Sequence, residues 1–78
     1  MYVYLTKEAP NQIPALFVIL KLEHAPTDHW LIKQISGLAK HQRQIACDKY
    51  ETFNSFNQAF YRFQQLIELK AEQGYTVQ

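Results

Sequence analysis

Residues 53–75 read FNSFNQAFYRFQQLIELKAEQGY, and this stretch decides the fold of the 78-residue chain. Ser55 is a good N-cap because its hydroxyl accepts a free backbone N–H of the first turn, and Gln58 completes an S-x-x-Q capping box. Gly74 supplies the left-handed conformation that ends many helices, and Tyr75 can fold back onto the last turn. The stretch therefore predicts one helix with its own start and stop signals.

Apolar side chains of this stretch recur at the i, i+3, i+4 and i+7 spacing of one helix face. They are Phe56, Ala59, Phe60, Phe63, Leu66 and Ile67. Lys70 lies at the C-terminal end of this stripe, where its stem can pack and its charge suits the negative end of the helix dipole. Three phenylalanines on one face are more than a surface helix needs, so a helix over about residues 55–73 must lie on another layer.

Four upstream segments have the composition of β-strands. Residues 1–6 (MYVYLT) alternate aromatic and aliphatic side chains and are expected at a sheet edge, whereas residues 15–22 (ALFVILKL) are apolar enough for a central strand. Residues 30–35 (WLIKQI) and 43–50 (RQIACDKY) complete the set, and Gly37 marks either a turn or a bulge. This order predicts an α+β domain, an antiparallel sheet of about four strands packed under one long C-terminal amphipathic helix.

The composition is that of one small globular domain over residues 1–78. It is 47% hydrophobic and 14% aromatic, which excludes a disordered chain. A chain of this size buries only about 60% of its unfolded surface, so it needs a dense core or a partner. The formal net charge of +1 favours no class of partner by itself. One cysteine cannot form an internal disulfide and no apolar run is long enough to span a membrane, so we expect a cytoplasmic protein without membrane association.

The chain resembles the WGR domain, a small module of DNA-dependent poly(ADP-ribose) polymerases and of short stand-alone bacterial proteins. The resemblance covers roughly residues 4–75 and is strongest over the helix. There the family's pattern of aromatic, Ser, Ala, Phe, Lys and closing aromatic corresponds to Phe53, Ser55, Ala59, Phe63, Lys70 and Tyr75. Where the family has Trp-Gly-Arg, this chain has Ser36-Gly37-Leu38. The resemblance implies the fold and a role for Lys70, whereas the family's Trp and Arg have no counterparts.

Basic residues gather around the hairpin that joins the third and fourth predicted strands. In the WGR family this hairpin is used for DNA, and phosphate neutralisation dominates the affinity of proteins for nucleic acids. One hypothesis is therefore a non-catalytic module that binds DNA or another nucleic acid through this hairpin. The candidate contacts are Lys33, Lys40, His41, Arg43, Lys49 and, on the helix, Lys70. The alternative for these residues is a solvated strand face that happens to be basic.

The outer face of the helix supports a second hypothesis, a protein–protein interaction or self-association module that has lost nucleic-acid binding. Tyr61 projects from that face beside Arg62, and Leu69 follows further along. Tyr and Arg are enriched at protein interfaces, although scattered surface aromatics are also ordinary. A homodimer can alternatively form through the strand edge at residues 1–5. The first hypothesis gains if the exposed aromatics and the basic cluster share one concave surface, and the second gains if the apolar exposure stands apart from the charge.

The other aromatic side chains have two interpretations. Tyr2, Tyr4, Tyr61 and Trp30 can act as stacking platforms for bases. More often such residues fill a small core or cover its rim, and we expect core packing for Trp30.

No residue pattern predicts catalysis. His24 and His29 lack the further convergent ligands that a zinc site requires. Cys47 follows Ile45 on the expected apolar face and is expected to be a small buried hydrophobe. We therefore expect a protein that is not an enzyme, with no cofactor, no metal and no small-molecule substrate.

Overall fold

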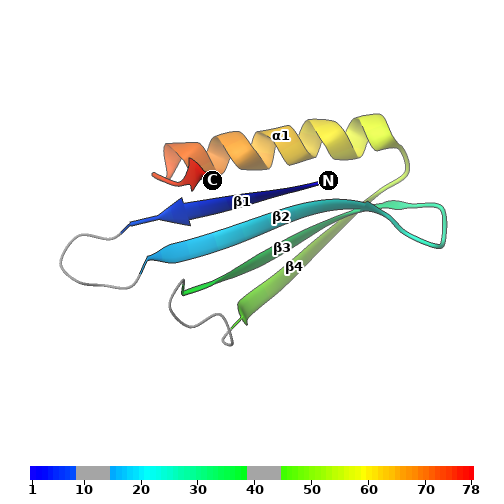
Figure 1. Cartoon of the computed structure of the whole chain (residues 1–78). Coiled ribbons are helices and arrows are strands. Elements are labelled where there is room, and N and C mark those ends of the chain that lie inside the picture. The colour runs from blue at the N-terminus through cyan, green and yellow to red at the C-terminus, as the bar shows by residue number, and fades with distance from the viewer. Residues whose placement is uncertain (9–14, 39–44) are drawn as a thin grey trace.

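The computed structural model describes residues 1–8, 15–38 and 45–78, with side chains in the last range described from Lys49 onward. Its elements are β1 (Tyr2–Lys7), β2 (Leu16–His24), β3 (Trp30–Leu38), β4 (Ile45–Phe53), α1 (Phe56–Glu72) and β5 (Thr76–Val77). The strands form one antiparallel sheet, and α1 lies across one face of it (Figure 1). The α+β class and the packing of the C-terminal helix on an antiparallel sheet are therefore confirmed.

The strands lie side by side in the order β4-β3-β2-β1-β5. β2 is central, as its apolar sequence predicts. The expectation that the first strand forms an edge is wrong for its C-terminal half, because β5 pairs with Leu5 and Thr6. The chain reverses at Gly74, whose φ is 97°, and then returns along β1, where the Gln78 N–H donates to the Tyr4 carbonyl at 2.9 Å.

Both ends of α1 follow the local signals in the sequence. Ser55 has extended backbone angles and its Oγ accepts from the Gln58 N–H at 3.3 Å, so it is the N-cap. After Gly74, the Tyr75 N–H donates to the Lys70 carbonyl at 3.0 Å and closes the last turn. These hydrogen bonds satisfy backbone groups that have no partner within the helix.

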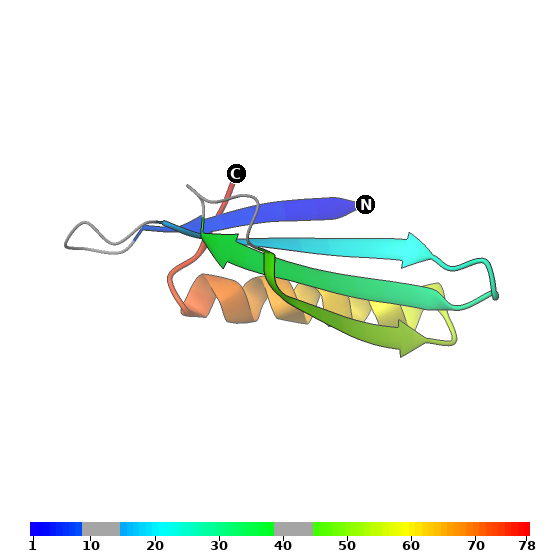
Figure 2. The same cartoon turned by 90° about the horizontal axis from the view of Figure 1, so that it is seen from below.

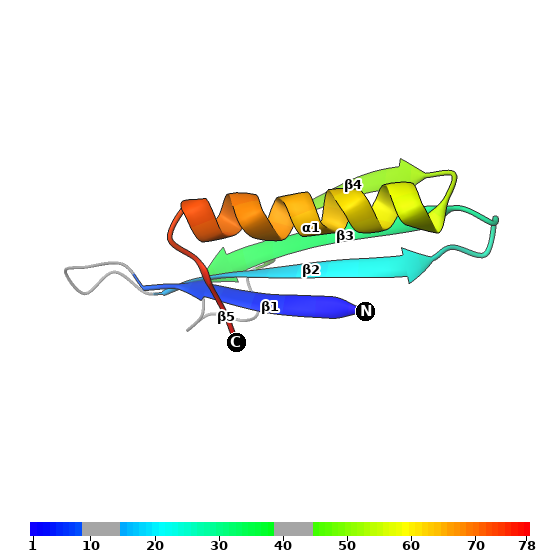
Figure 3. The same cartoon turned by 90° about the horizontal axis from the view of Figure 1, so that it is seen from above.

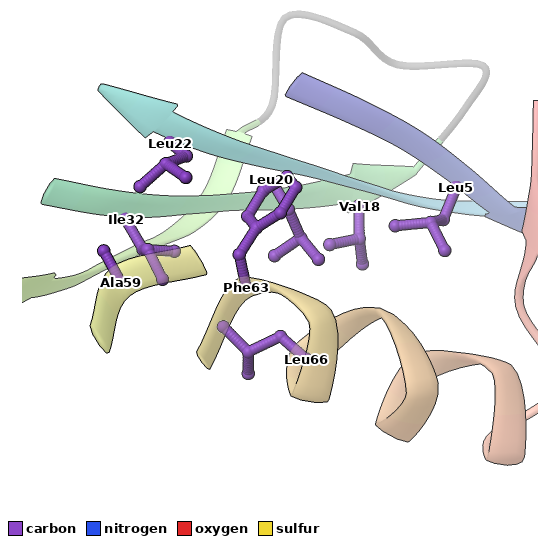
Figure 4. Close-up of a cluster of buried hydrophobic side chains, with 8 residues drawn as sticks. All are labelled: Leu5, Val18, Leu20, Leu22, Ile32, Ala59, Phe63 and Leu66. Atoms are coloured by element: carbon purple, nitrogen blue, oxygen red, sulfur yellow. The ribbon is translucent and has the colours of Figure 1, made fainter. Parts of the chain in front are cut away.

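The core lies between α1 and the sheet face beneath it (Figure 4). Its buried residues are Leu5 from β1, Val18, Leu20 and Leu22 from β2, Ile32 from β3, and Ala59, Phe63 and Leu66 from α1. Burying each large aliphatic side chain contributes roughly 1.5–3 kcal/mol. This single layer holds the helix to the sheet, and it fixes which strand residues face away from the helix.

β3 and β4 extend beyond the predicted strands. β3 runs through Gly37 to Leu38, and its register with β4 shifts between Ser36 and Gly37. Ser36 pairs with Cys47 but Gly37 pairs with Ile45, so β4 carries one extra residue there. Of the two interpretations of Gly37, the bulge is confirmed.

Candidate nucleic-acid interface

One face of the sheet is not covered by the helix, as the two opposite views in Figures 2 and 3 show. Side chains alternate between the two faces along a strand. Because Leu5, Leu20 and Ile32 point towards α1, their neighbours in sequence point to the other face. We call this the open face; its residues include Tyr2, Tyr4, Thr6, Phe17, Ile19, Lys21, Glu23, Leu31, Lys33, Ile35, Tyr50 and Thr52.

Two tyrosines and two lysines form a line across the open face. Tyr2 pairs with Lys21, Lys21 pairs with Lys33, and Lys33 pairs with Tyr50. We call these four residues the tyrosine–lysine row. Neighbouring strands lie about 4.8 Å apart, so the row spans roughly 14 Å between its outer Cα atoms. Tyr2 is 70% exposed and Tyr50 is 59% exposed, so both rings are available to a ligand.

The two lysines of the row carry like charges directly opposite each other, an arrangement that destabilises a strand pair. Part of this cost is offset by Glu23, whose Oε2 lies 3.1 Å from the Lys33 Nζ. Among the residues whose side chains the structure describes, no carboxylate lies within ion-pair distance of Lys21. Among these side chains, the centre of the open face therefore carries an excess of positive charge.

Beside the row lies a half-buried apolar surface. Tyr4 pairs with Ile19, and Ile19 pairs with Ile35, so these three residues form the next line across the sheet. The Tyr4 ring stacks on Phe17 with ring centroids 5.9 Å apart. The open face thus combines exposed aromatic rings, a lysine pair and apolar side chains, which is the combination that protein surfaces use for unpaired bases.

Two other predicted contacts lie on the covered face. Lys49 pairs with Gln34, which places it on the side of α1, and partial burial together with the charge of Lys49 lowers the pKa of Lys70. The Lys70 Nζ lies 5.4 Å from the centre of the Tyr75 ring, and the Lys7 Nζ lies 5.8 Å from the same ring. We call Lys7, Lys49, Lys70 and Tyr75 the helix-side cluster.

The two described lysines of the predicted basic hairpin therefore do not share one surface. Lys33 lies on the open face, whereas Lys49 lies with Lys70 on the opposite side. Lys40, His41 and Arg43 lie outside the described residues.

Sequence reasoning missed Lys21 and Tyr50, and it left two interpretations for Tyr2. The alternation of side chains along residues 15–22 does place Lys21 on the side opposite Leu20 and Leu22. That signal indicates only which face the lysine occupies. Its neighbours across the sheet depend on the register of three strand pairs.

The predicted protein interface is only partly exposed. Tyr61 is 65% exposed and Leu69 is 44% exposed, in agreement with an outer helix face. Arg62 is half-buried, and its Nε donates to the Glu51 Oε1 at 3.0 Å, which ties α1 to β4. Arg62 and Leu69 line a shallow depression with Gln65, Glu68 and Glu72. Tyr61 is not among the lining residues.

His24 contacts two side chains that are close to it in the sequence. The His24 ring stacks on Trp30 with centroids 4.6 Å apart, and its Nε2 lies 3.2 Å from the Asp28 Oδ1. Trp30 in turn packs against the core and meets the edge of Phe56 at 4.9 Å, as expected for a core aromatic. Within the described ranges, no three His, Cys, Asp or Glu residues are grouped to hold a metal ion. The same part of the chain contains no helix with the length and hydropathy needed to cross a membrane.

No protein-family model, curated protein or solved structure matches the chain. The resemblance to the WGR domain stays an expectation that rests on the residues named for it.

Proposed function

We propose that this protein is a non-catalytic, WGR-like, nucleic-acid-binding module and that its open face is the binding surface. The observation that carries the proposal is the tyrosine–lysine row. Exposed aromatic rings and basic side chains lie there on one face of the sheet, and this supports nucleic-acid binding. The single cysteine fits a reducing compartment and supports a cytoplasmic location.

The chemistry of the row suits a polyanion with aromatic bases. Lysine ammonium groups neutralise phosphates and release counterions, which gives affinity without reading sequence. Exposed tyrosine rings add base stacking, which tolerates every base. The proposal therefore implies binding that is sequence-tolerant and strongly dependent on salt.

The residues of the predicted hairpin support the same class of ligand. Lys40, His41 and Arg43 stay candidates for additional phosphate contacts. Lys49 and Lys70 are candidates as well, but on the other face. Lys70 lies partly buried beside the helix, whereas the lysines of the open face lie between two exposed tyrosines, so we assign the main binding surface to the open face.

The test is a fluorescence-anisotropy titration of labelled DNA and RNA, single- and double-stranded, at about 50 and 200 mM salt. The variant is Lys21→Gln/Lys33→Gln, and the matched control is Lys49→Gln/Lys70→Gln, which removes the same charge from the covered face. We expect the wild-type affinity to fall steeply with salt. We expect the open-face variant to lose at least about tenfold in affinity for single strands and to lower their salt slope by about 1.4, and the control variant, which keeps the open face, to lose clearly less.

Absence of binding to every nucleic acid at the lower salt concentration contradicts the proposal. Equal losses in the two double variants contradict the assignment to the open face. Circular dichroism of both variants ensures that a loss reflects the missing charges and not unfolding.

A protein-interaction module is the second candidate, and the exposure of Tyr61 and Leu69 favours it. Both lie on the helix, away from the lysines of the open face. Sedimentation equilibrium over a wide concentration range tests self-association. A homodimer that dissociates in a Tyr61→Ala/Leu69→Ala variant supports this candidate. A monomer at all concentrations removes the homodimer and leaves only a different protein partner.

A further inference from the structure

We propose that the ligand of the open face is a single-stranded nucleic acid that crosses the sheet along the tyrosine–lysine row. Bases stack on Tyr2 and Tyr50, and the phosphates between them contact Lys21 and Lys33. This inference rests on the proposed nucleic-acid function and specifies the substrate class.

The exposure of the two tyrosine rings argues for unpaired bases. Both rings stand on a sheet face with more than half of their surface free. A ring of this kind stabilises a base only by covering one of its flat faces, and within a duplex both faces are already covered by stacked neighbours. A duplex meets the row only with its phosphates and leaves both rings unused. A single strand, in contrast, can stack its bases on the rings and place its phosphates at the lysines.

The spacing of the row fixes how the strand lies. The outer Cα atoms are roughly 14 Å apart, and a stacked strand advances only about 3.4 Å per nucleotide. Tyr2 and Tyr50 therefore hold bases that are not adjacent, with backbone between them. That backbone passes over the lysine pair, because Lys21 and Lys33 occupy the two central strands. The intervening bases meet the apolar line that contains Ile19 and Ile35.

The two lysines are not equivalent. Lys33 is already held by Glu23 at 3.1 Å, whereas Lys21 has no such partner among the described residues. A phosphate at Lys33 competes with the Glu23 carboxylate, and a phosphate at Lys21 does not. Lys21 is therefore the stronger phosphate contact, and Glu23 opposes binding.

The test compares four probes by anisotropy at about 50 mM salt. They are a thymidine octanucleotide, the same octanucleotide paired with its complement, an octamer of abasic nucleotides, and a thymidine dinucleotide. The abasic octamer keeps the phosphates without the bases, and the dinucleotide is too short to reach both tyrosines. We expect the single-stranded octanucleotide to bind at least about tenfold more tightly than each of the other three.

The protein variants are Tyr2→Leu/Tyr50→Leu and, as the matched control, Tyr61→Leu on the outer face of α1. All three tyrosines are mostly exposed, so none of these changes opens a cavity in the core. We expect the double variant to lose about tenfold or more in affinity for the thymidine octanucleotide and to bind the abasic octamer as the wild type does. The control keeps wild-type affinity for both probes.

Two results overturn the inference, and they differ in what they say about the proposed function. If the duplex binds as tightly as the single strand and only the lysine variants lose affinity, nucleic-acid binding stands and the single-strand assignment is wrong. If no probe binds the wild type, the proposed function is wrong, and this inference is wrong as well. Thermal unfolding of each variant shows that the protein tested is folded.

Discussion

The covered face and the open face of the sheet are made from alternate residues of the same strands, yet the residues at their centres differ in chemistry. Leu20 and Ile32 are almost wholly buried under α1, at 0% and 1% exposure. Their neighbours Lys21 and Lys33 point the other way and carry charge. Because a strand has a period of two, one short segment places apolar side chains in the core and charged side chains on the opposite face.

The two faces also differ in how their lysine side chains are accommodated. On the covered face, Lys70 lies partly buried near Lys49, and its pKa is lowered. On the open face, Lys21 and Lys33 are opposite each other, and only one of them has a described carboxylate partner. Neither arrangement is explained by stability, so each invites a substitution that separates stability from binding.

The largest expected effect comes from the covered face. Leu20→Ala removes a fully buried side chain from the core and should lower the free energy of unfolding by about 2–5 kcal/mol. Ile19→Ala, one residue away on the open face, should cost clearly less because Ile19 is only half-buried. Urea unfolding followed by circular dichroism measures both. Equal losses would mean that the open face is also covered in solution.

A smaller effect, of opposite sign for stability and binding, is expected at the lysine pair. Lys21→Thr removes a like-charge contact and places a strand-forming residue on β2, so it should raise the free energy of unfolding by about 0.2–1 kcal/mol. The same change should weaken binding to single-stranded DNA by several-fold. Urea unfolding and anisotropy on one preparation test both. A variant that is both less stable and weaker in binding would make Lys21 a structural residue.

How far the sequence alone predicts this molecule depends on the range of the signal. The start of α1 at Ser55 and its end at Gly74 are local signals, and both were confirmed. The two-residue strand Thr76–Val77 was not predictable, because it becomes a strand only by pairing with β1.

The residues of the candidate site could likewise be predicted only where a local signal marks them. Lys33 was singled out because it belongs to a basic hairpin, which is a feature of sequence. Lys21 and Tyr50 were not, because their position beside Lys33 follows from the registers of β2 with β3 and of β3 with β4. A register is set by long-range pairing and by the bulge near Gly37, neither of which a local pattern encodes.

A third prediction concerns the charge on the covered face. Because the pKa of Lys70 is lower in the folded protein, the unfolded chain binds more protons as the pH approaches 10.5, and stability should rise with pH in that range. Lys49→Glu places an opposite charge there and should stabilise the fold at neutral pH by about 0.2–1 kcal/mol. The same substitution should also remove the part of the rise in stability with pH that comes from the charge of Lys49. Thermal unfolding at pH values from neutral to about 10 checks both. An unchanged pH profile in Lys49→Glu would show that burial alone lowers the Lys70 pKa.

The smallest expected effect is at Glu23, and it is the most specific test of the open face. Glu23→Gln frees Lys33 from its ion pair and removes a negative charge from the path of the phosphates. Affinity for single-stranded DNA should rise about two- to fivefold, and the loss of one exposed ion pair should change stability by less than about 1 kcal/mol. Glu68→Gln on α1 is the matched control, because it makes the same change in net charge away from the row. If both variants raise affinity equally, the gain comes from net charge alone. A gain confined to Glu23→Gln places the phosphate beside Lys33.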